Sequence, residues 1–372
     1  MSGRWDHYDE SAARIRPSKR GSRPRSKRRP EHQDAVIGRI VTVDRGRYRA
    51  HVSAEAADDG APARVVTAVR AKELRRKPVV PGDRVSLVGD LSGQPGTLAR
   101  LVKIQPRTTM LRRSADDTDE VERVIVANAD QLLIVVAAAN PEPRHGFVDR
   151  ALAAAFDAGL DPLICVTKAD LRDPEEFLAP YRHLQIPIVI SHPVDDGSID
   201  PGMSLPLDQD FLAEVQELLA GHITVLLGHS GVGKSTLVNA LTGSTRATSH
   251  VNVVTGRGRH TSSSAQAIAI DDGVDDTWVI DTPGVRTLGL GHVPAENILA
   301  AFTDLVPATA ECPRGCTHAA GAPGCMLDPW VAEGKAGPAG AQRLDSLRKL
   351  LLSRTDALEE GDDDAKELGT LG

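Results

Sequence analysis

The chain has 372 residues, of which 41% are hydrophobic and 26% charged, a composition typical of a globular protein with room for two or three domains. No apolar run approaches the roughly 18 to 20 residues that cross a bilayer, and none follows the polar N-terminus, so we expect a cytoplasmic protein without a membrane partner. The net charge of −7 says little about partners, because the charges are unevenly spread.

The first segment, residues 1–35, is strongly basic. From Arg14 to Arg29, nine of sixteen residues are Lys or Arg and none is acidic. Such a segment cannot bury enough apolar surface to order itself, so we expect a flexible arm. The arm is compatible both with attraction to RNA or DNA phosphates and with a solvated tail that has no dedicated partner.

Residues 36–113 show short stretches of alternating hydrophobicity separated by turn residues. Strands are expected at 36–43, 48–53, 63–69, 84–88 and 97–104. Five short strands with little helix are typical of a small closed barrel of the oligonucleotide-binding (OB) type, with a β-domain used only for packing as the alternative. The connection after the expected strand at 63–69 should carry a cluster of basic residues, namely Arg70, Lys72, Arg75, Arg76 and Lys77.

Residues 114–305 alternate strands with helices, which predicts a doubly wound α/β domain. Strands are expected at 131–137, 162–166, 187–190, 223–227, 265–270 and 277–280, and helices at 148–158 and 211–219. Several of these strands are apolar throughout, as expected for a parallel sheet that is covered on both faces.

A first motif, Thr167-Lys168-Ala169-Asp170, follows the strand at 162–166. It resembles the guanine-recognition motif of GTPases, with Thr167 in place of the more usual Asn. The Asp170 carboxylate would accept hydrogen bonds from N1–H and the exocyclic amine of guanine, and the Lys168 stem would pack along the base. A generic loop that opens a helix is the alternative.

A second motif follows the strand at 223–227. Gly228, four further residues, Gly233, Lys234 and Ser235 fit the phosphate-binding loop, in which backbone N–H groups converge on a polyphosphate at the start of a helix. Lys234 would reach the β and γ phosphates, and Ser235 would ligate Mg²⁺. The expected nucleotide-binding residues of this loop are Gly228, His229, Ser230, Gly231, Val232, Gly233, Lys234, Ser235 and Thr236.

Two further stretches are interpreted as switch regions. The polar stretch 250–264 lies where a switch loop is expected, and Thr261 is our choice to ligate Mg²⁺, with Ser262 as a substitute. In Asp281-Thr282-Pro283-Gly284, the Asp281 carboxylate would accept a water of the Mg²⁺ shell and the Gly284 amide would bond the γ phosphate.

Three of these residues, Lys234, Thr261 and Gly284, are expected to act in catalysis. Val285 stands where many GTPases place a Gln that orients the attacking water. An apolar side chain cannot orient water, so we expect slow intrinsic turnover and a partner that supplies the missing group.

A cysteine and histidine cluster follows, within an expected zinc-binding domain at 306–355. Its members are Cys312, Cys316, His318 and Cys325. Three thiolates and one imidazole at this spacing can hold one tetrahedral Zn²⁺. Cys165 lies in an apolar strand and is expected in the core. An amphipathic helix at 341–353 should pack on the zinc module, and residues 356–372 are expected to form an acidic, solvated tail.

The order of the motifs is inverted. Ordinary GTPases have the phosphate loop first, whereas here the guanine motif at 167 precedes the phosphate loop at 228, and no second copy follows Gly284. All of these loops lie on one edge of the sheet, so a rotated chain order preserves the site. The sequence therefore predicts a circularly permuted GTPase domain.

This order, with a barrel before it and the Cys/His cluster behind it, resembles the RsgA family of ribosome-small-subunit-dependent GTPases over residues 36–350. Other family-like stretches are 127–131, 258–261 and 281–284. The resemblance implies a GTPase that binds the 30S subunit and its 16S rRNA late in maturation and is stimulated by that subunit. It also implies one Zn²⁺ per chain, Mg²⁺ with GTP or GDP, and a monomer.

Two other functions are compatible with the sequence. A P-loop kinase or ATPase would let ATP compete with GTP, and a nucleotide-gated RNA-binding protein would show negligible turnover. The family's Ser-Ala pair at the base pocket is Ser191-His192 here, which leaves the contact of Ser191 unassigned.

Overall fold

The computed structural model describes residues 32, 34–74, 77–113, 123–182, 184–191, 207–243, 265–270, 276–282 and 288–352. The expected switch loop, acidic tail and basic arm, except for residues 32, 34 and 35 of the arm, lie outside these residues. The described residues from 35 onward belong to one compact unit. Within the described residues, no helix is both long enough and apolar enough to span a membrane.

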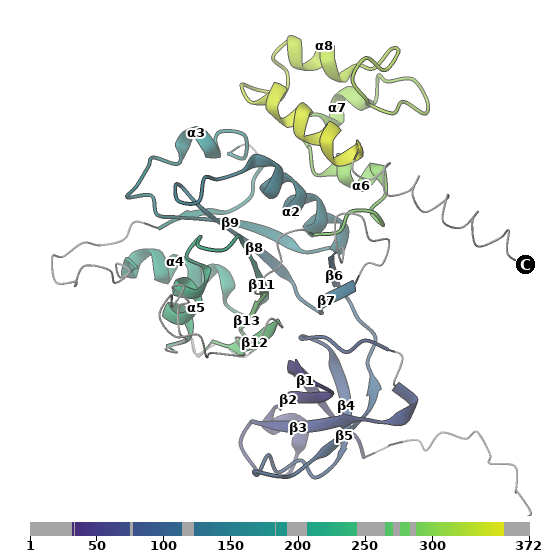
Figure 1. The fold of residues 1–372 in the computed structure, drawn as a ribbon, viewed down its shortest axis with the longest axis vertical. Coiled ribbons are helices and arrows are strands. Elements are labelled where there is room, and N and C mark those ends of the chain that lie inside the picture. Colours follow the sequence, from purple (N-terminus) through teal and green to yellow (C-terminus); the bar gives the residue numbers. More distant parts are fainter. Residues whose placement is uncertain are drawn as a thin grey trace, which may run out of the picture. The chain divides into compact units, whose positions relative to one another are not determined.

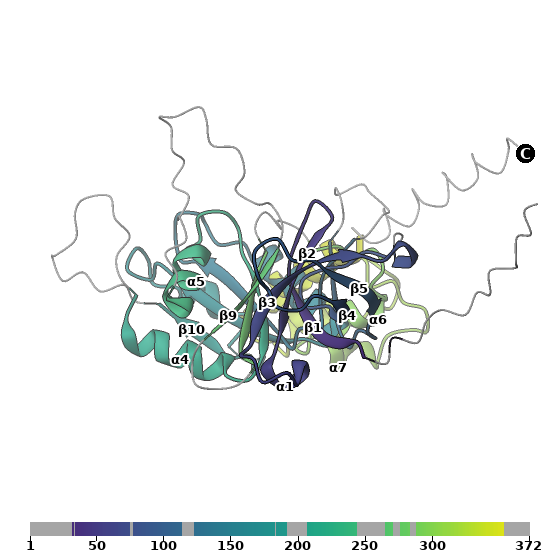
Figure 2. The same cartoon turned by 90° about the horizontal axis from the view of Figure 1, so that it is seen from below.

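Five strands form the predicted closed barrel (Figure 2). They are β1 (Val36–Asp44), β2 (Arg47–Val52), β3 (Arg64–Arg70), β4 (Arg84–Gly89) and β5 (Ala99–Ile104). The order is β1-β2-β3-β5-β4, and β4 pairs again with β1, which closes the sheet. Along β2, Tyr48, Ala50 and Val52 are buried while Arg47 and Arg49 are exposed, as the alternation predicted. A short helix, α1 (Ala54–Ala57), and a 3₁₀ turn, η2 (Lys72–Leu74), lie in the connections.

A second set of strands forms the sheet of the α/β region. In spatial order they are β10 (Ile188–Ile190), β9 (Asp161–Thr167), β8 (Gln131–Ala137), β11 (Ile223–Leu227) and β13 (Trp278–Asp281), all parallel. The next strand, β12 (Gln266–Ala269), runs antiparallel to β13. The prediction of a parallel sheet is wrong for β12, because the short link from Ala269 to Trp278 cannot hold the crossover that parallel strands need.

Helices cover both faces of the parallel strands (Figure 1). They are α2 (His145–Ala158), α3 (Glu175–Leu178), α4 (Gln209–Leu219) and α5 (Lys234–Thr242). Along β8, Leu132, Ile134 and Val136 pack in one core with α2, while the alternate residues pack in a second core with α4 and α5. This two-sided burial explains why the strand is apolar throughout.

Two pairings that the sequence did not predict join the barrel to the sheet. β6 (Met110–Arg113) and β7 (Arg123–Ala127) pair antiparallel, so the expected boundary at 113/114 falls in the connection between two paired strands. Thr42 of β1 also lies opposite Gln266 of β12, which makes the barrel and the α/β sheet continuous.

The C-terminal region is helical. It contains α6 (Ala295–Ala300), α7 (Val306–Thr309), α8 (Leu327–Ala332) and a helix over 340–352. The last helix packs on the Cys/His segment, as predicted, because Arg348 donates a hydrogen bond to the carbonyl of His318 at 3.1 Å. Arg343 of the same helix is 1% exposed and pairs with Asp149 of α2 at 2.8 Å and with Asp304 at 3.0 Å.

Candidate guanine-nucleotide site and metal centre

The loop between β11 and α5 has the backbone that a phosphate-binding loop requires. Gly233 directly precedes α5 and has φ +88°, which favours glycine. At Gly228, an added Cβ would lie 2.6 Å from the carbonyl oxygen of Val135 on β8, so a side chain cannot fit there. The helix begins at Lys234, as the sequence predicted, and its first N–H groups are available to an anion.

The guanine motif lies directly against this loop. The Thr167 hydroxyl donates a hydrogen bond to the carbonyl of Val232 at 2.6 Å, and Lys168 Nζ donates to the carbonyl of Gly231 at 2.7 Å. Lys168 also donates to the carbonyl of Asn140, a contact that sequence reasoning missed. The two motifs are therefore neighbours in space although their order in the chain is inverted.

Beside this junction lies a cavity of about 230 Å³. Its lining residues are Thr167, Lys168, Asp170, Leu171, Ser191, Leu207, Phe211, Gly233, Thr236 and Leu237. Asp170 is exposed, whereas Ser191 is fully buried and its hydroxyl has no hydrogen-bond partner among the described residues. An apolar cavity with a carboxylate and an unpartnered hydroxyl suits a flat, polar-edged base. Leu207 and Phe211 were not anticipated here, because apolar residues around a helix start indicate core packing.

The other end of the loop carries the charged groups. Lys234 forms an ion pair with Asp281, which ends β13 next to Leu226 of β11. Thr282 is buried and donates a hydrogen bond to the carbonyl of Leu226 at 2.7 Å, which joins the end of β13 to β11 just before the phosphate loop. Ser235 is exposed on the first turn of α5. Thr261 and Gly284 lie outside the described residues, so the structure does not place them.

His229 contacts α2 from within the loop. Its ring centroid lies 4.2 Å from that of Phe147, and the two rings are tilted by 41°. This contact packs the side chain of His229, which is one of the expected nucleotide-binding residues, against α2.

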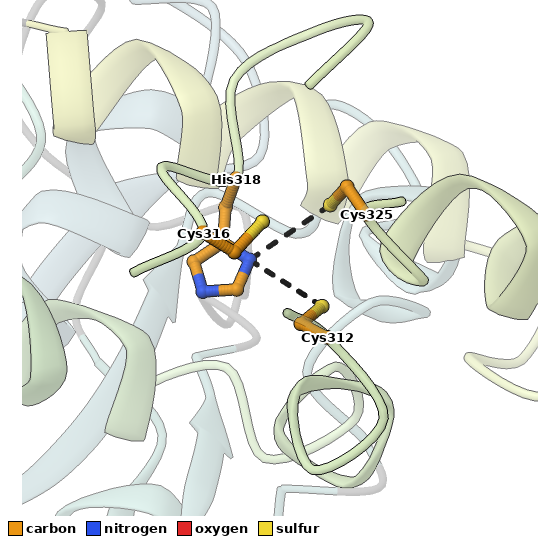
Figure 3. Close-up of side chains that lie close together, drawn as sticks. All are labelled: Cys312, Cys316, His318 and Cys325. Atoms are coloured by element: carbon orange, nitrogen blue, oxygen red, sulfur yellow. Dashed lines mark hydrogen bonds between the residues drawn. The ribbon is translucent and has the colours of Figure 1, made fainter. Parts of the chain in front are cut away.

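The Cys/His cluster can hold one metal ion (Figure 3). The ligand atoms of Cys312, Cys316, His318 and Cys325 lie within 4.8 Å of one another. His318 Nδ1 is 3.8 Å from the sulfur of Cys312 and 3.8 Å from that of Cys325. Tetrahedral Zn²⁺ with Zn–S bonds of ~2.3 Å separates its ligand atoms by roughly this distance. The donor set and its size therefore fit Zn²⁺.

The thiols differ in their surroundings. Burial, with a smaller contribution from the neighbouring Cys316, raises the pKa of Cys325 to about 11. A bound cation would favour the thiolate and overcome this cost. Cys165 is fully buried in β9, where burial raises its pKa to about 12, so it is a core residue as predicted.

Comparison with known proteins decides the family. The family model described as RsgA GTPase matches residues 104–291, a range that contains the guanine motif, the phosphate loop and Asp281-Thr282-Pro283-Gly284. The chain belongs to the RsgA GTPase family. It is similar to the "small ribosomal subunit biogenesis GTPase RsgA" of Pseudomonas syringae pv. tomato, with 35% identity over 277 residues, 74% of this chain and 75% of that protein. The protein of the same name from Pseudomonas aeruginosa strain LESB58 is 34% identical, over 74% of this chain and 76% of its own.

Solved structures show the same fold as this RsgA-family chain. YloQ, described as a circularly permuted GTPase, matches with a TM-score of 0.58 and 23% identity over 88% of this chain and 98% of its own. YjeQ from Thermotoga maritima matches with a TM-score of 0.57 and 23% identity over 86% of this chain and 99% of its own. The predicted fold class, a barrel followed by a circularly permuted GTPase domain and a Cys/His module, is confirmed.

Proposed function

We propose that this chain hydrolyses GTP during late maturation of the 30S ribosomal subunit and that the subunit stimulates the hydrolysis. The observation that carries the proposal is the contact of Lys168 with the carbonyl of Gly231, which sets a guanine motif beside a phosphate loop. Membership of the RsgA GTPase family and the names of the similar proteins supply the biological setting.

The roles of the base-binding residues follow from the cavity beside that contact. Asp170, which lines the cavity, would accept from N1–H and the exocyclic amine of guanine. The Ser191 hydroxyl, buried without a partner among the described residues, is a second group for the base edge. Thr167 and Lys168 are bound to the phosphate loop and would hold it in place while Lys168 packs along the base.

At the phosphate end, Lys234 would neutralise the β and γ phosphates, and Ser235 with Thr261 would hold Mg²⁺. Bound Mg²⁺ would neutralise charge on the β and γ oxygens. Asp281, now paired with Lys234, would accept from a water of the Mg²⁺ shell, and Gly284 would bond the γ phosphate. Val285 offers no group that orients water, so this role falls to the subunit.

The barrel is the proposed surface for 16S rRNA. Residues 36–113 contain sixteen Lys and Arg against seven Asp and Glu, although the whole chain is net negative. Positive charge of this kind attracts phosphates without sequence preference. We place the protein in the cytoplasm as a monomer, with one Zn²⁺ on Cys312, Cys316, His318 and Cys325. We divide it into an arm (1–35), a barrel (36–113), a GTPase domain (114–305), a zinc domain (306–355) and a tail (356–372).

Measurement of GTP hydrolysis with and without purified 30S subunits tests this proposal. We expect slow turnover by the protein alone, a large increase with subunits, and loss of the increase in Lys234→Ala, which lacks the phosphate-binding amine. Subunits alone serve as the control. No increase with subunits would favour a nucleotide-gated RNA-binding protein, and equal hydrolysis of ATP would favour an ATPase.

A further inference from the structure

A groove of about 860 Å³ lies at the sheet edge opposite the nucleotide site. It is lined at the amino ends of the parallel strands by Gln131 of β8, Asp161 of β9 and Ile188 of β10, together with parts of α2 and α4. The guanine motif and phosphate loop lie at the carboxyl ends of β9 and β11. This edge groove is therefore separate from the site described above.

The floor of the edge groove is apolar. It includes Leu184, Ile186 and Leu218, and Phe156 of α2 lines it with 41% of its surface exposed. A large aromatic side chain that remains this exposed beside other apolar residues marks a surface suited to contact with an apolar group.

The walls of the edge groove are acidic. Asp161, Glu214 and Glu217 are all exposed, and their carboxylates form no ion pair or hydrogen bond with other described residues. Within the described part of the chain, no Lys or Arg lines the groove, and His222 is its one basic group. Three like charges without counter-charges favour a cationic partner and repel the phosphates of nucleic acid.

The helices reinforce this charge. α2 ends at Ala158 and α4 ends at Leu219, so both carboxyl termini, which carry partial negative charge, point toward this edge. Glu217 lies in the last turn of α4, where a cation rather than an anion is stabilising, and that turn contains no basic residue. A positively charged ligand would relieve this unfavourable arrangement.

We propose that the edge groove binds a Lys/Arg-rich polypeptide segment of a partner protein, with an apolar side chain of that segment packed on Phe156 and basic side chains paired with Asp161, Glu214 and Glu217. The apolar floor argues for a peptide over a free metal ion, because a metal ion gains nothing from apolar contact. The groove is distant from the nucleotide loops, so this proposal is independent of the proposed GTPase role.

The test uses the full chain and a fluorescein-labelled peptide in which Arg and Lys residues surround a leucine pair. Anisotropy titrations compare wild type with the triple variant Asp161→Asn, Glu214→Gln, Glu217→Gln. The matched control is Glu55→Gln, Glu296→Gln, Glu311→Gln, which removes three exposed carboxylates outside the groove and gives the same net charge. Both proteins keep the acidic C-terminal residues, so binding there affects them equally.

We expect wild type and the control to bind the peptide alike and the groove variant to bind it about fivefold or more weakly. Phe156→Ser should also weaken binding, because it removes apolar contact without altering charge. GDP affinity should be the same in all four proteins, which shows that they are folded. Equal peptide affinity in the groove variant and the control would overturn the proposal. The proposal would also be overturned if the groove substitutions changed the affinity for a short single-stranded RNA but not the affinity for the peptide.

Discussion

The Lys168 amine donates a hydrogen bond to the backbone carbonyl of Gly231 at 2.7 Å. This bond joins the motif that would select guanine to the loop that would hold the phosphates. The two residues come from loops after β9 and β11, which flank β8 in the sheet. The permuted chain order therefore leaves the geometry of the site intact, since both strands end at the same edge.

Gly82 tests how firmly the barrel is fixed to the GTPase region. It has φ +86°, and an added Cβ would lie 2.0 Å from the carbonyl oxygen of Ala127 on β7. Gly82→Ala should lower the free energy of unfolding by about 3 kcal/mol or more. Gly46→Ala is the matched control, because Gly46 has φ +83° with nothing within 4 Å, and should cost only about 1–2 kcal/mol. Equal losses in denaturant titrations of the two variants would contradict this packing.

Arg343 tests the connection between the C-terminal helix and α2. Its guanidinium pairs with Asp149 and Asp304, and all three side chains are at most 3% exposed. Arg343→Met leaves two buried carboxylates without a counter-charge and should cost about 3–5 kcal/mol of unfolding free energy. Lys349→Met, which removes an exposed pair on the same helix, should cost less than about 1 kcal/mol. Calorimetry of both variants would refute this account if the two costs were alike.

His145 should make stability depend on pH. Burial lowers its pKa below 6.5, an effect that Arg343 assists and Asp149 opposes, and its Nδ1 lies 3.1 Å from the Tyr181 hydroxyl. The unfolded chain therefore binds this proton more readily, so the contribution of neutral His145 is present above about pH 6.5 and is lost as pH falls through and below that value.

Replacement of this histidine isolates its contribution. His145→Gln should flatten the dependence of unfolding free energy on pH between about 7 and 5, by at most about 1.4 kcal/mol per pH unit. His51 and His318, whose pKa values burial also lowers, remain in the variant and cancel in the comparison. Identical pH profiles for wild type and His145→Gln would contradict the prediction.

The Cys/His cluster predicts a metal content. Purified protein should contain one Zn²⁺ per chain by elemental mass spectrometry, and Cys316→Ser should lose it, because a neutral hydroxyl is a poor Zn²⁺ ligand. Cys165→Ser is the control and should retain the metal, since Cys165 is buried in β9 away from the cluster. Retention of Zn²⁺ by Cys316→Ser would show that Cys316 is not a required ligand.

Sequence reasoning succeeded where local pattern and burial agree. The expected strands at 131–137 and 223–227 match β8 and β11, because both are short apolar runs, and β11 also ends at the phosphate loop. It missed β6 and β7, whose pairing joins segments separated by a long connection and shows no clear alternation. The direction of β12 was wrong for a related reason, since a residue pattern does not encode which strand it pairs with.

Arg343 shows the same limit at the level of a side chain. An arginine in an amphipathic helix normally lies on the solvated face. The burial of Arg343 is favourable only because Asp149 and Asp304, from distant parts of the chain, form ion pairs with it. The grouping of the Cys/His cluster and the backbone of the phosphate loop were predictable because each set lies within a short stretch of sequence. Two contacts were not predictable: the ring contact of Phe147 with His229 and the hydrogen bond from Lys168 to the carbonyl of Asn140. Both depend on how α2 and the loop before it pack.

The central claim is that the guanine motif and the phosphate loop hold one guanine nucleotide. Calorimetric titration of wild type and Asp170→Asn with GDP, xanthosine diphosphate (XDP) and ADP tests it most directly. Wild type should bind GDP and reject ADP, while Asp170→Asn should bind GDP about tenfold to hundredfold more weakly and gain affinity for XDP, whose C2 carbonyl accepts the new amide N–H. Glu176→Gln, an exposed control nearby, should behave as wild type. Equal affinity of wild type for ADP and GDP, or an unchanged preference in Asp170→Asn, would show that these two loops do not hold one guanine nucleotide.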